Sequence, residues 1–263
     1  MNRSSLLSTR ALNVSIAGKQ VCSDLDLDLS AGMCLGILGA NGIGKTTLLH
    51  TLAGLRSPDA GEIFLAGEAI RDLPRRRIAR KLGLLIQQQE DSLPASVLET
   101  ALIGRHPHIG FWRWESHSDV AIARRMLKLT GLDGLEQRTQ THLSGGERRR
   151  LAIATILAQD PAVFLLDEPT HQLDLQHQIN LLDLFAQLAH GQNRLVVVSL
   201  HDVNLAARFC SHVLLMFGAG ETLMGPTRDI LTAANLTRLY RIPVRPVSWP
   251  GGTLFVPERE PRT

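Results

Sequence analysis

The sequence predicts an α/β fold with a mostly parallel sheet and a helical insert. Short apolar runs typical of buried strands alternate with helical patterns up to residue 87 and again after residue 160. Residues 88–160 carry helical patterns alone. Strands separated by helices pair in parallel, because a parallel connection needs a long crossover. We therefore expect one domain over residues 1–263, with an α/β core of 1–87 and 161–263 and a helical part of 88–160.

The first part of the core begins with β-structure. Three leucines alternate over residues 11–30 with three aspartates, the period of a strand with one wet face: Leu25, Leu27 and Leu29 with Asp24, Asp26 and Asp28. An apolar run at 33–38 predicts a buried strand, and a helix over 45–55 follows. Beyond a turn at 57–62, we expect a strand near 63–66, a helix opened by Pro74 and ending at 81, and a strand at 82–86.

The helical part begins at a capping pattern. Ser96 and Glu99 have the spacing of a capping box, which predicts a helix to about residue 104. Apolar residues at helical spacing predict a second helix that ends near residue 130.

After residue 160 strands and helices alternate again. We expect strands at 163–166, 195–200 and 213–217, and helices at 176–189, 202–209, 226–231 and 233–240. Pro250-Gly251-Gly252 separates two apolar segments, which predicts a terminal hairpin.

Composition narrows the class of protein. Apolar residues make up 44% and charged residues 20% of the chain, and the formal net charge of +3 is too small to argue for nucleic-acid binding. The cysteines, Cys22, Cys34 and Cys210, have neither metal-ligand spacing nor the pattern of a disulfide framework. No apolar stretch has the length of a membrane span or of a signal peptide core. These features predict a cytosolic protein.

Residues 39–47, GANGIGKTT, match the phosphate-binding loop G-x-x-x-x-G-K-[ST]. The loop stands between a predicted buried strand and a predicted helix, which is the context that the motif needs. Its glycines allow backbone N–H groups to surround phosphates at the positive end of the helix. Lys45 can reach the outer phosphates, and the hydroxyl of Thr46 can hold Mg²⁺. The alternative, a glycine turn with a chance lysine, explains less of this context.

Two adjacent carboxylates, Asp167 and Glu168, follow the predicted strand 163–166. The carboxyl ends of strands form the ligand-binding edge of an α/β sheet. Asp167 is therefore placed to support the Mg²⁺ held by Thr46, while Glu168 points elsewhere and can orient an attacking water. The alternative is a solvated acidic turn, which the upstream phosphate loop disfavours.

A third motif, LSGGE at 143–147, precedes a strongly helical run over 148–158. Ser144 and Glu147 have capping-box spacing, so Ser144 lies at a helix N-terminus where two glycines expose backbone N–H groups. This arrangement can form a second anion site. A well-capped surface helix has the same spacing, and the pattern alone leaves both interpretations open.

Five motifs occur in a fixed order: GANGIGKTT at 39–47, Gln87 after a strand, LSGGE at 143–147, LLDEP at 165–169 and His201 after VVVSL, with Leu173-Asp174 after the acidic pair. Over nearly its whole length, the chain thereby resembles the nucleotide-binding subunit of ABC transporters. The resemblance implies a phosphate-loop NTPase core, an N-terminal antiparallel β-subdomain, and a helical subdomain that carries the LSGGE signature.

The resemblance also implies that two copies face each other head to tail with ATP between them. The loop of one copy surrounds the phosphates through Gly39, Asn41, Gly42, Gly44, Lys45, Thr46 and Thr47. Mg²⁺ is supported by Thr46, Gln87 and Asp167. Glu168 polarises the attacking water and His201 contacts the γ-phosphate, and Lys45 and Gln87 complete the catalytic set. The other copy contributes Ser144, Gly145 and Gly146, and Asp174 helps to couple the two sites.

The chain departs from the family in two places. Family members usually stack adenine on an aromatic residue near the start, but none lies between Met1 and Glu62, and the expected place falls near Ile16. Adenine then rests on aliphatic surface. The signature ends in Glu147 where glutamine is commoner, and helix capping accepts either residue.

The stretch GRHPHIG at 104–110, together with SLHDVNLAARF at 199–209, is similar to importers of iron chelates, haem and cobalamin. The resemblance implies a homodimer that docks two multi-span permeases through the helical insert, with a periplasmic or lipid-anchored binding protein beyond them and no nucleic acid. The chain then lies peripherally on the cytoplasmic face of the inner (plasma) membrane. The alternatives are an exporter subunit, which is more often fused to membrane spans, and a soluble ABC ATPase acting on ribosomes or DNA, which typically has tandem domains or a coiled coil.

Two further features are interpreted as ordinary surface. His106 and His108 belong to a polar loop, since no third metal ligand lies at a suitable spacing. Arg75–Arg77 and Arg148–Arg150 are interpreted as solvated helix faces, and the second run has contact with a partner or acidic lipid as its alternative.

Overall fold

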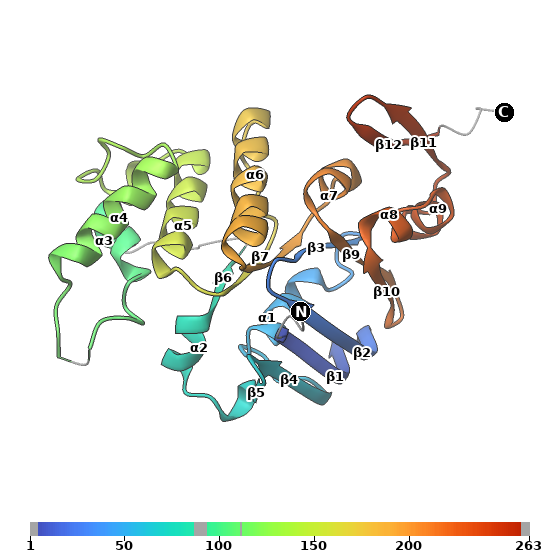
Figure 1. Ribbon diagram of the computed structural model, residues 1–263, viewed down its shortest axis with the longest axis horizontal. Helices are drawn as coiled ribbons and strands as arrows, with labels where there is room; N and C mark the ends of the chain where they lie inside the picture. The colour runs from blue at the N-terminus through green and yellow to red at the C-terminus, as the bar shows by residue number, and fades with distance from the viewer. Residues whose placement is uncertain (1–4, 87–93, 111, 259–263) are drawn as a thin grey trace.

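The computed structural model describes residues 5–86, 94–110 and 112–258. Among these residues, the centre is a six-stranded sheet with the strand order β10-β9-β3-β8-β7-β6 (Figure 1). Its strands are β3 (Cys34–Gly39), β6 (Leu82–Leu85), β7 (Val163–Leu166), β8 (Leu195–Ser199), β9 (His212–Gly218) and β10 (Glu221–Pro226). Neighbours pair in parallel except β9 and β10, which confirms the predicted α/β class with a mostly parallel sheet. The sequence pattern does not predict β10.

Each face of this sheet carries a hydrophobic core. Alternate side chains of β7 and β8 belong to different clusters, Phe164, Leu166, Val196 and Val198 to one and Val163, Leu165, Leu195 and Val197 to the other. Helices α6 (Leu175–Gln192) and α7 (Val203–Phe209) pack in the first cluster. Helix α1 (Lys45–Leu52) packs in the second, together with the N-terminal sheet. Strands buried on both faces are continuously apolar, as the sequence shows.

The N-terminal sheet is antiparallel and has the order β2-β1-β4-β5. Its strands are β1 (Ser5–Ile16), β2 (Lys19–Ser30), β4 (Ala60–Leu65) and β5 (Glu68–Ala69). In β2 the three leucines are buried and the three aspartates are exposed, which confirms the predicted alternation.

Three helices form a bundle beside the sheet, at the left of Figure 1. They are α3 (Val97–Ile103), α4 (His117–Leu129) and α5 (Gly145–Gln159), and they share a small apolar cluster. Helix α2 (Arg75–Lys81) leads into β6, and short 3-10 turns occupy Ile70–Asp72 and Gln140–His142. Capping boxes at Ser96 and Ser144 open α3 and α5, as predicted. Helix α5 also contributes Ile153 and Ile156 to the sheet core, so it joins the bundle to the sheet.

The C-terminal part contains α8 (Thr227–Ile230), α9 (Ala233–Tyr240) and a hairpin of β11 (Val244–Trp249) and β12 (Gly252–Pro257). The predicted terminal hairpin is thereby confirmed. The side chain of Asn204 on α7 holds it by bonds to both the N–H (2.8 Å) and the carbonyl (3.3 Å) of Phe255. No helix in the described parts of the chain has the length and apolar character that crossing a membrane requires.

Candidate active site

The loop between β3 and α1 has a strongly curved backbone. Gly42 and Gly44 have φ angles of 72° and 108°, in the left-handed region that glycine adopts without strain. A Cβ atom at Gly44 would lie 2.6 Å from Cγ2 of Val21, whereas a Cβ at Gly42 would meet nothing within 4 Å. The loop therefore passes tightly against β2 at one glycine and borders open space at the other. Gly39 ends β3, Asn41 is exposed in the loop, and Thr47 lies in the first turn of α1.

Lys45 begins α1 and reaches back to the loop. Its ammonium donates hydrogen bonds to the carbonyl oxygens of Gly39 (2.9 Å) and Ala40 (3.3 Å), and the residue is buried. Burial lowers the pKa of Lys45, and the carboxylates of Glu168 and Asp167 act in the opposite direction. The cation thus lies within the field of the acidic pair, at the place predicted for the phosphates.

Asp167 connects the loop to the end of β7. Its Oδ2 accepts a hydrogen bond from the Thr46 hydroxyl (2.7 Å), and its Oδ1 accepts one from the Ser199 hydroxyl (2.7 Å). A buried carboxylate beside a threonine hydroxyl suits Mg²⁺, which takes few protein ligands and completes its octahedron with water and phosphate oxygens. The predicted ligands Thr46 and Asp167 therefore fit the metal. The third, Gln87, lies outside the described residues.

Glu168 and His201 face each other at the same edge of the sheet. Nε2 of His201 lies 2.5 Å from Oε1 of Glu168. The backbone of Glu168 has a φ of 45°, and its N–H donates to the hydroxyl of Ser199 (2.8 Å). The two acidic side chains reach different partners, as the sequence predicts. Ser199, at the end of β8, bonds to the carboxylate of Asp167 and to the backbone N–H of Glu168.

The signature residues form the N-terminal end of α5. The Ser144 hydroxyl accepts the N–H of Glu147 (3.2 Å), and the Glu147 carboxylate accepts the N–H of Ser144 (2.7 Å). The bond from the Ser144 backbone lowers the pKa of Glu147. Beside this cap, a Cβ atom at Gly145 would lie 3.1 Å from Oε1 of Gln172, so the glycine allows close contact with the segment before α6.

Asp174 caps α6. Its carboxylate accepts the N–H of His177 (2.9 Å) and lies 2.7 Å from Nδ1 of that ring, and the backbone bond lowers the pKa of Asp174. The residues predicted for one site thus fall into two groups within the described chain. One group meets at the sheet edge, and the other consists of the helix ends that carry Ser144 and Asp174.

Arg149 was not among the predicted site residues, and its interpretation as part of a solvated face is wrong. Its exposed fraction is 7%, whereas Arg148 is exposed. The guanidinium of Arg149 donates to four backbone carbonyls: those of Ile86 (2.7 Å), Asp167 (2.7 Å), Glu168 (2.7 Å) and Pro169 (3.2 Å). The sequence contains a pattern that indicates this burial. Arg149 shares one helical face with Ala152, Ile153 and Ile156, which are all apolar.

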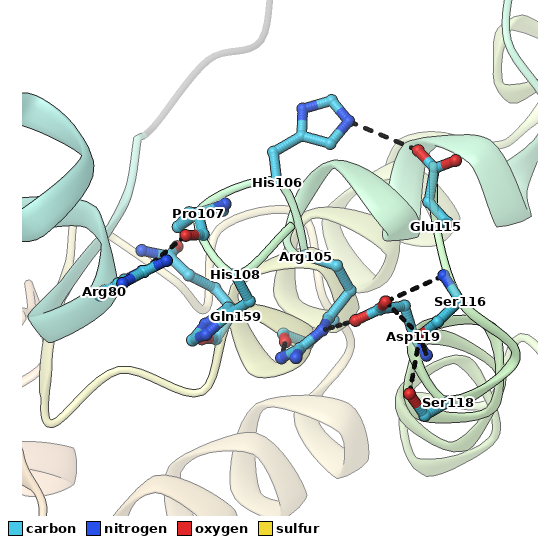
Figure 2. A network of polar contacts seen from close by, with 11 residues as sticks. Arg80, Arg105, His106, Pro107, His108, Glu115, Ser116, Ser118, Asp119 and Gln159 are labelled. Atoms are coloured by element: carbon cyan, nitrogen blue, oxygen red, sulfur yellow. Dashed lines mark hydrogen bonds and ion pairs between the residues drawn. The ribbon is translucent and has the colours of Figure 1, made fainter. Parts of the chain in front are cut away.

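The stretch 104–110 is held by the neighbouring helices (Figure 2). Arg105 donates to the carboxylate of Asp119 on α4 (3.0 Å) and to the carbonyl oxygen of Ala158 on α5 (2.8 Å). A ring nitrogen of His108 lies 2.8 Å from the carbonyl oxygen of Gln159. Arg105 and His108 therefore fix this stretch to the bundle.

Helix α2 holds the same stretch from the other side. The carbonyl oxygen of Pro107 accepts hydrogen bonds from Nε of Arg76 (3.0 Å) and Nε of Arg80 (2.7 Å). Arg75 and Arg77 are exposed as expected, but Arg76 is half-buried, so the solvated-face interpretation does not hold for it. Trp112 and Trp114 follow, with exposed fractions of 92% and 90%.

The place expected for adenine contains an aliphatic side chain. Ile16 ends β1 with an exposed fraction of 41% and pairs with Lys19 across the first hairpin. Val21 of the same hairpin contacts the phosphate loop at Gly44. The hairpin therefore presents aliphatic surface next to the loop.

Comparisons with known proteins find relatives over most of this chain. The ferric enterobactin transport ATP-binding protein FepC of Escherichia coli is 37% identical over 84% of this chain and 81% of its own length. The hemin import ATP-binding protein HmuV of Bordetella pertussis is 35% identical over 90% and 92%. The cobalamin import ATP-binding protein BtuD of Halobacterium salinarum is 36% identical over 89% of this chain, which spans 58% of that longer relative.

Solved structures are similar over nearly the whole chain. A metal-chelate type ABC transporter in an inward-facing conformation superposes with a TM-score of 0.84 at 32% identity, covering 97% of this chain and 98% of that one. The ATP-binding cassette MJ0796, solved as a dimer bound to ADP and Pi, superposes with a TM-score of 0.74 at 25% identity, covering 84% and 99%. The sequence model of the family described as ABC transporter matches residues 22–171, more than half of the chain. The chain therefore belongs to the ABC transporter family, as one of its ATP-binding subunits.

Proposed function

We propose that the protein hydrolyses ATP and thereby powers an importer of an iron chelate, haem or cobalamin. The observation that carries the proposal is the pairing of Asp167 with Thr46 at 2.7 Å and of Glu168 with His201 at 2.5 Å on one sheet edge. These pairs separate a group suited to Mg²⁺ from a group suited to a water molecule, as hydrolysis of a phosphate chain requires.

Each residue of the loop has a physical task in this proposal. The backbone N–H groups of residues 39–47 bind phosphate oxygens, and Lys45 exchanges its carbonyl partners for the outer phosphates. Mg²⁺, when bound, neutralises charge on the phosphates. Thr46, Asp167 and Gln87 hold it. Glu168 positions and polarises the attacking water, and His201 fixes Glu168 while contacting the γ-phosphate.

The second half of the site comes from another copy of the chain. Helix α5 has 15 residues, and its first N–H groups, at Gly145 and Gly146, form an anion-binding end. Ser144 is exposed at this end. We propose that this end contacts the phosphates bound by the partner copy and that Asp174, at the adjacent helix end, couples the two sites. The structure of a relative as a dimer supports this arrangement.

The helical part provides the surface for two membrane permeases. Arg105 and His108 anchor the stretch 104–110 to α4 and α5, and Arg76 and Arg80 anchor it to α2. A hollow of about 400 Å³ beside it is lined by His106, Arg113 and Trp114, among others. A rigid rim with exposed aromatic and basic side chains suits a protein partner, because such side chains are enriched at interfaces. The protein then lies at the cytoplasmic face of the membrane, and a binding protein delivers the cargo from the other side.

The relatives support the choice of cargo. Proteins named for ferric enterobactin and for hemin transport match this chain over most of both lengths. The structure of the metal-chelate type transporter matches 97% of this chain. Because the ATPase does not touch the cargo in this proposal, the permease and the binding protein determine which chelate is carried.

Isolation with the membrane partner tests the proposal. The tagged protein is purified from detergent-solubilised membranes and reconstituted with the permease that accompanies it. We expect ATP hydrolysis that rises when a ferric chelate, haem or cobalamin is supplied with its binding protein. Recovery with ribosomes or DNA and without any membrane protein would overturn the proposal.

A further inference from the structure

The buried guanidinium of Arg149 lies where three sequence motifs meet. It belongs to α5, five residues after Ser144, and it contacts the three consecutive carbonyls of residues 167–169. Its Nη1 also donates to the carbonyl oxygen of Ile86, the residue before Gln87. Arg149 thus joins the helix that carries the signature to two other places. One is the acidic pair, and the other is Ile86, directly after β6.

The turn that Arg149 holds has an unusual backbone. Glu168 has a φ of 45°, a conformation that side-chain-bearing residues adopt only where the surroundings maintain it. Carbonyls of consecutive residues point to one side here, and a planar guanidinium with several donors matches such a set. The N–H of Glu168 is fixed separately by Ser199. The position of the Glu168 carboxylate therefore depends on where α5 places Arg149.

We infer that Arg149 is a positioning residue through which helix α5 sets the placement of Glu168. The inference rests on the proposed function of Ser144 and Glu168. Because residues 144 and 149 lie on one capped helix, a displacement of its N-terminal end moves the guanidinium. Engagement of Ser144 with the partner's ATP is thereby transmitted to the water-positioning group of the same chain.

The geometry separates this role from nucleotide binding. Within the described residues, the hydrogen bonds of Arg149 go to backbone carbonyls at the strand ends, among them that of Asp167. The carboxylate of Asp167 is held separately by the hydroxyls of Thr46 and Ser199, and Lys45 bonds to the loop. A substitution at Arg149 should therefore lower kcat and leave nucleotide affinity nearly unchanged. A purely structural residue would affect both.

The full-length protein with Arg149→Met provides the first test, with Arg124→Met on the exposed side of α4 as the matched control. We expect kcat to fall about tenfold to a hundredfold, the effect of a small misplacement of a reacting group. Nucleotide Kd should stay within about threefold of wild type, and the control should match wild type. Should Arg149→Met fail to fold, Arg149→Lys decides by the same measurements, since an ammonium cannot bridge four carbonyls. Unchanged kcat, or equal losses in kcat and affinity, would overturn the inference.

A double-mutant cycle with Ser144→Ala tests the transmission itself. If Arg149 carries the effect of Ser144 to Glu168, Ser144→Ala lowers kcat in the wild-type background and changes it little in the Arg149→Met background. Equal effects in both backgrounds would contradict the inference. If Ser144→Ala left kcat unchanged in the wild-type background, that result would contradict the proposed function and not the inference about Arg149. The two failures are therefore distinguishable.

Discussion

Glu168 shows how single residues build this site. Its left-handed backbone costs about 1–3 kcal/mol, and such a conformation persists only where neighbouring groups fix it. Ser199 and Arg149 provide those groups, one at the N–H and one at the carbonyl. Part of the folding free energy therefore maintains the position of one carboxylate against His201.

Replacement of Glu168 by glutamine keeps the size of the side chain and removes its charge. We expect phosphate release to fall by at least about a hundredfold, because a positioned base contributes about 10²–10⁴-fold. Lys45 and the loop are untouched, so ATP should still bind, and light scattering should find an ATP-bound dimer. Asp28→Asn, which changes an exposed carboxylate of β2, should behave as wild type. Normal hydrolysis by Glu168→Gln would rule out the assigned role.

The sequence predicted the functional side chains at the sheet edge, but it did not predict the residues that hold them in place. Lys45, Thr46 and Asp167 belong to local motifs, and the structure brings them together as expected. Ser199 and Arg149 act across strand ends that are neighbours only in the fold. A motif read along the chain contains no information about such neighbours, although helical periodicity marked Arg149 as facing the core.

At the scale of elements, the local sequence pattern predicted helix starts well and predicted the edge strand of the central sheet poorly. Capping boxes predicted α3 and α5, whose caps the structure confirms. Helix α1 ends at Leu52, three residues earlier than expected, where Gly54 has a φ of 67° and stops the helix. Strand β10 was missed because Gly225 and Pro226 weaken the strand pattern, which an edge strand tolerates.

Asp119 provides a pH-dependent test of the helical bundle. The hydroxyl of Ser116, followed by Arg105 and the Ser116 backbone, lowers the pKa of Asp119 to about 2. A depressed carboxyl pKa contributes stability that is present above its unfolded value of about 4 and is lost as the pH falls through the folded value. Asp119→Asn should therefore lower the Tm by about 2–4 °C at pH 7 and by progressively less as the pH falls toward 2.

Scanning calorimetry across pH measures this difference. Asp133→Asn, an exposed carboxylate in the turn after α4, is the control and should leave the Tm unchanged at every pH. A Tm difference for Asp119→Asn that is the same at pH 7 and near pH 2 would show that its charge does not stabilise the bundle.

At the scale of the whole molecule, one chain contains the two separate groups of residues that the proposed function assigns to a nucleotide site. The phosphate loop, acidic pair and His201 lie together, while Ser144 and Asp174 form hydrogen bonds within their own helix caps. The sequence predicted both parts, and their union across two copies follows from the family resemblance rather than from any pattern in the chain. We expect each site to need both copies of the chain.

Mixing two inactive variants tests whether a site is shared between two chains. Lys45→Ala disables the loop of one chain, and Ser144→Ala disables the signature of the other, so neither homodimer has an intact site. A mixed dimer contains one site with a native loop and a native signature. We predict that the mixture recovers up to about a quarter of wild-type hydrolysis, because half of randomly formed dimers are mixed and each has one working site. Activity equal to the mean of the two separate variants would contradict a site shared between chains.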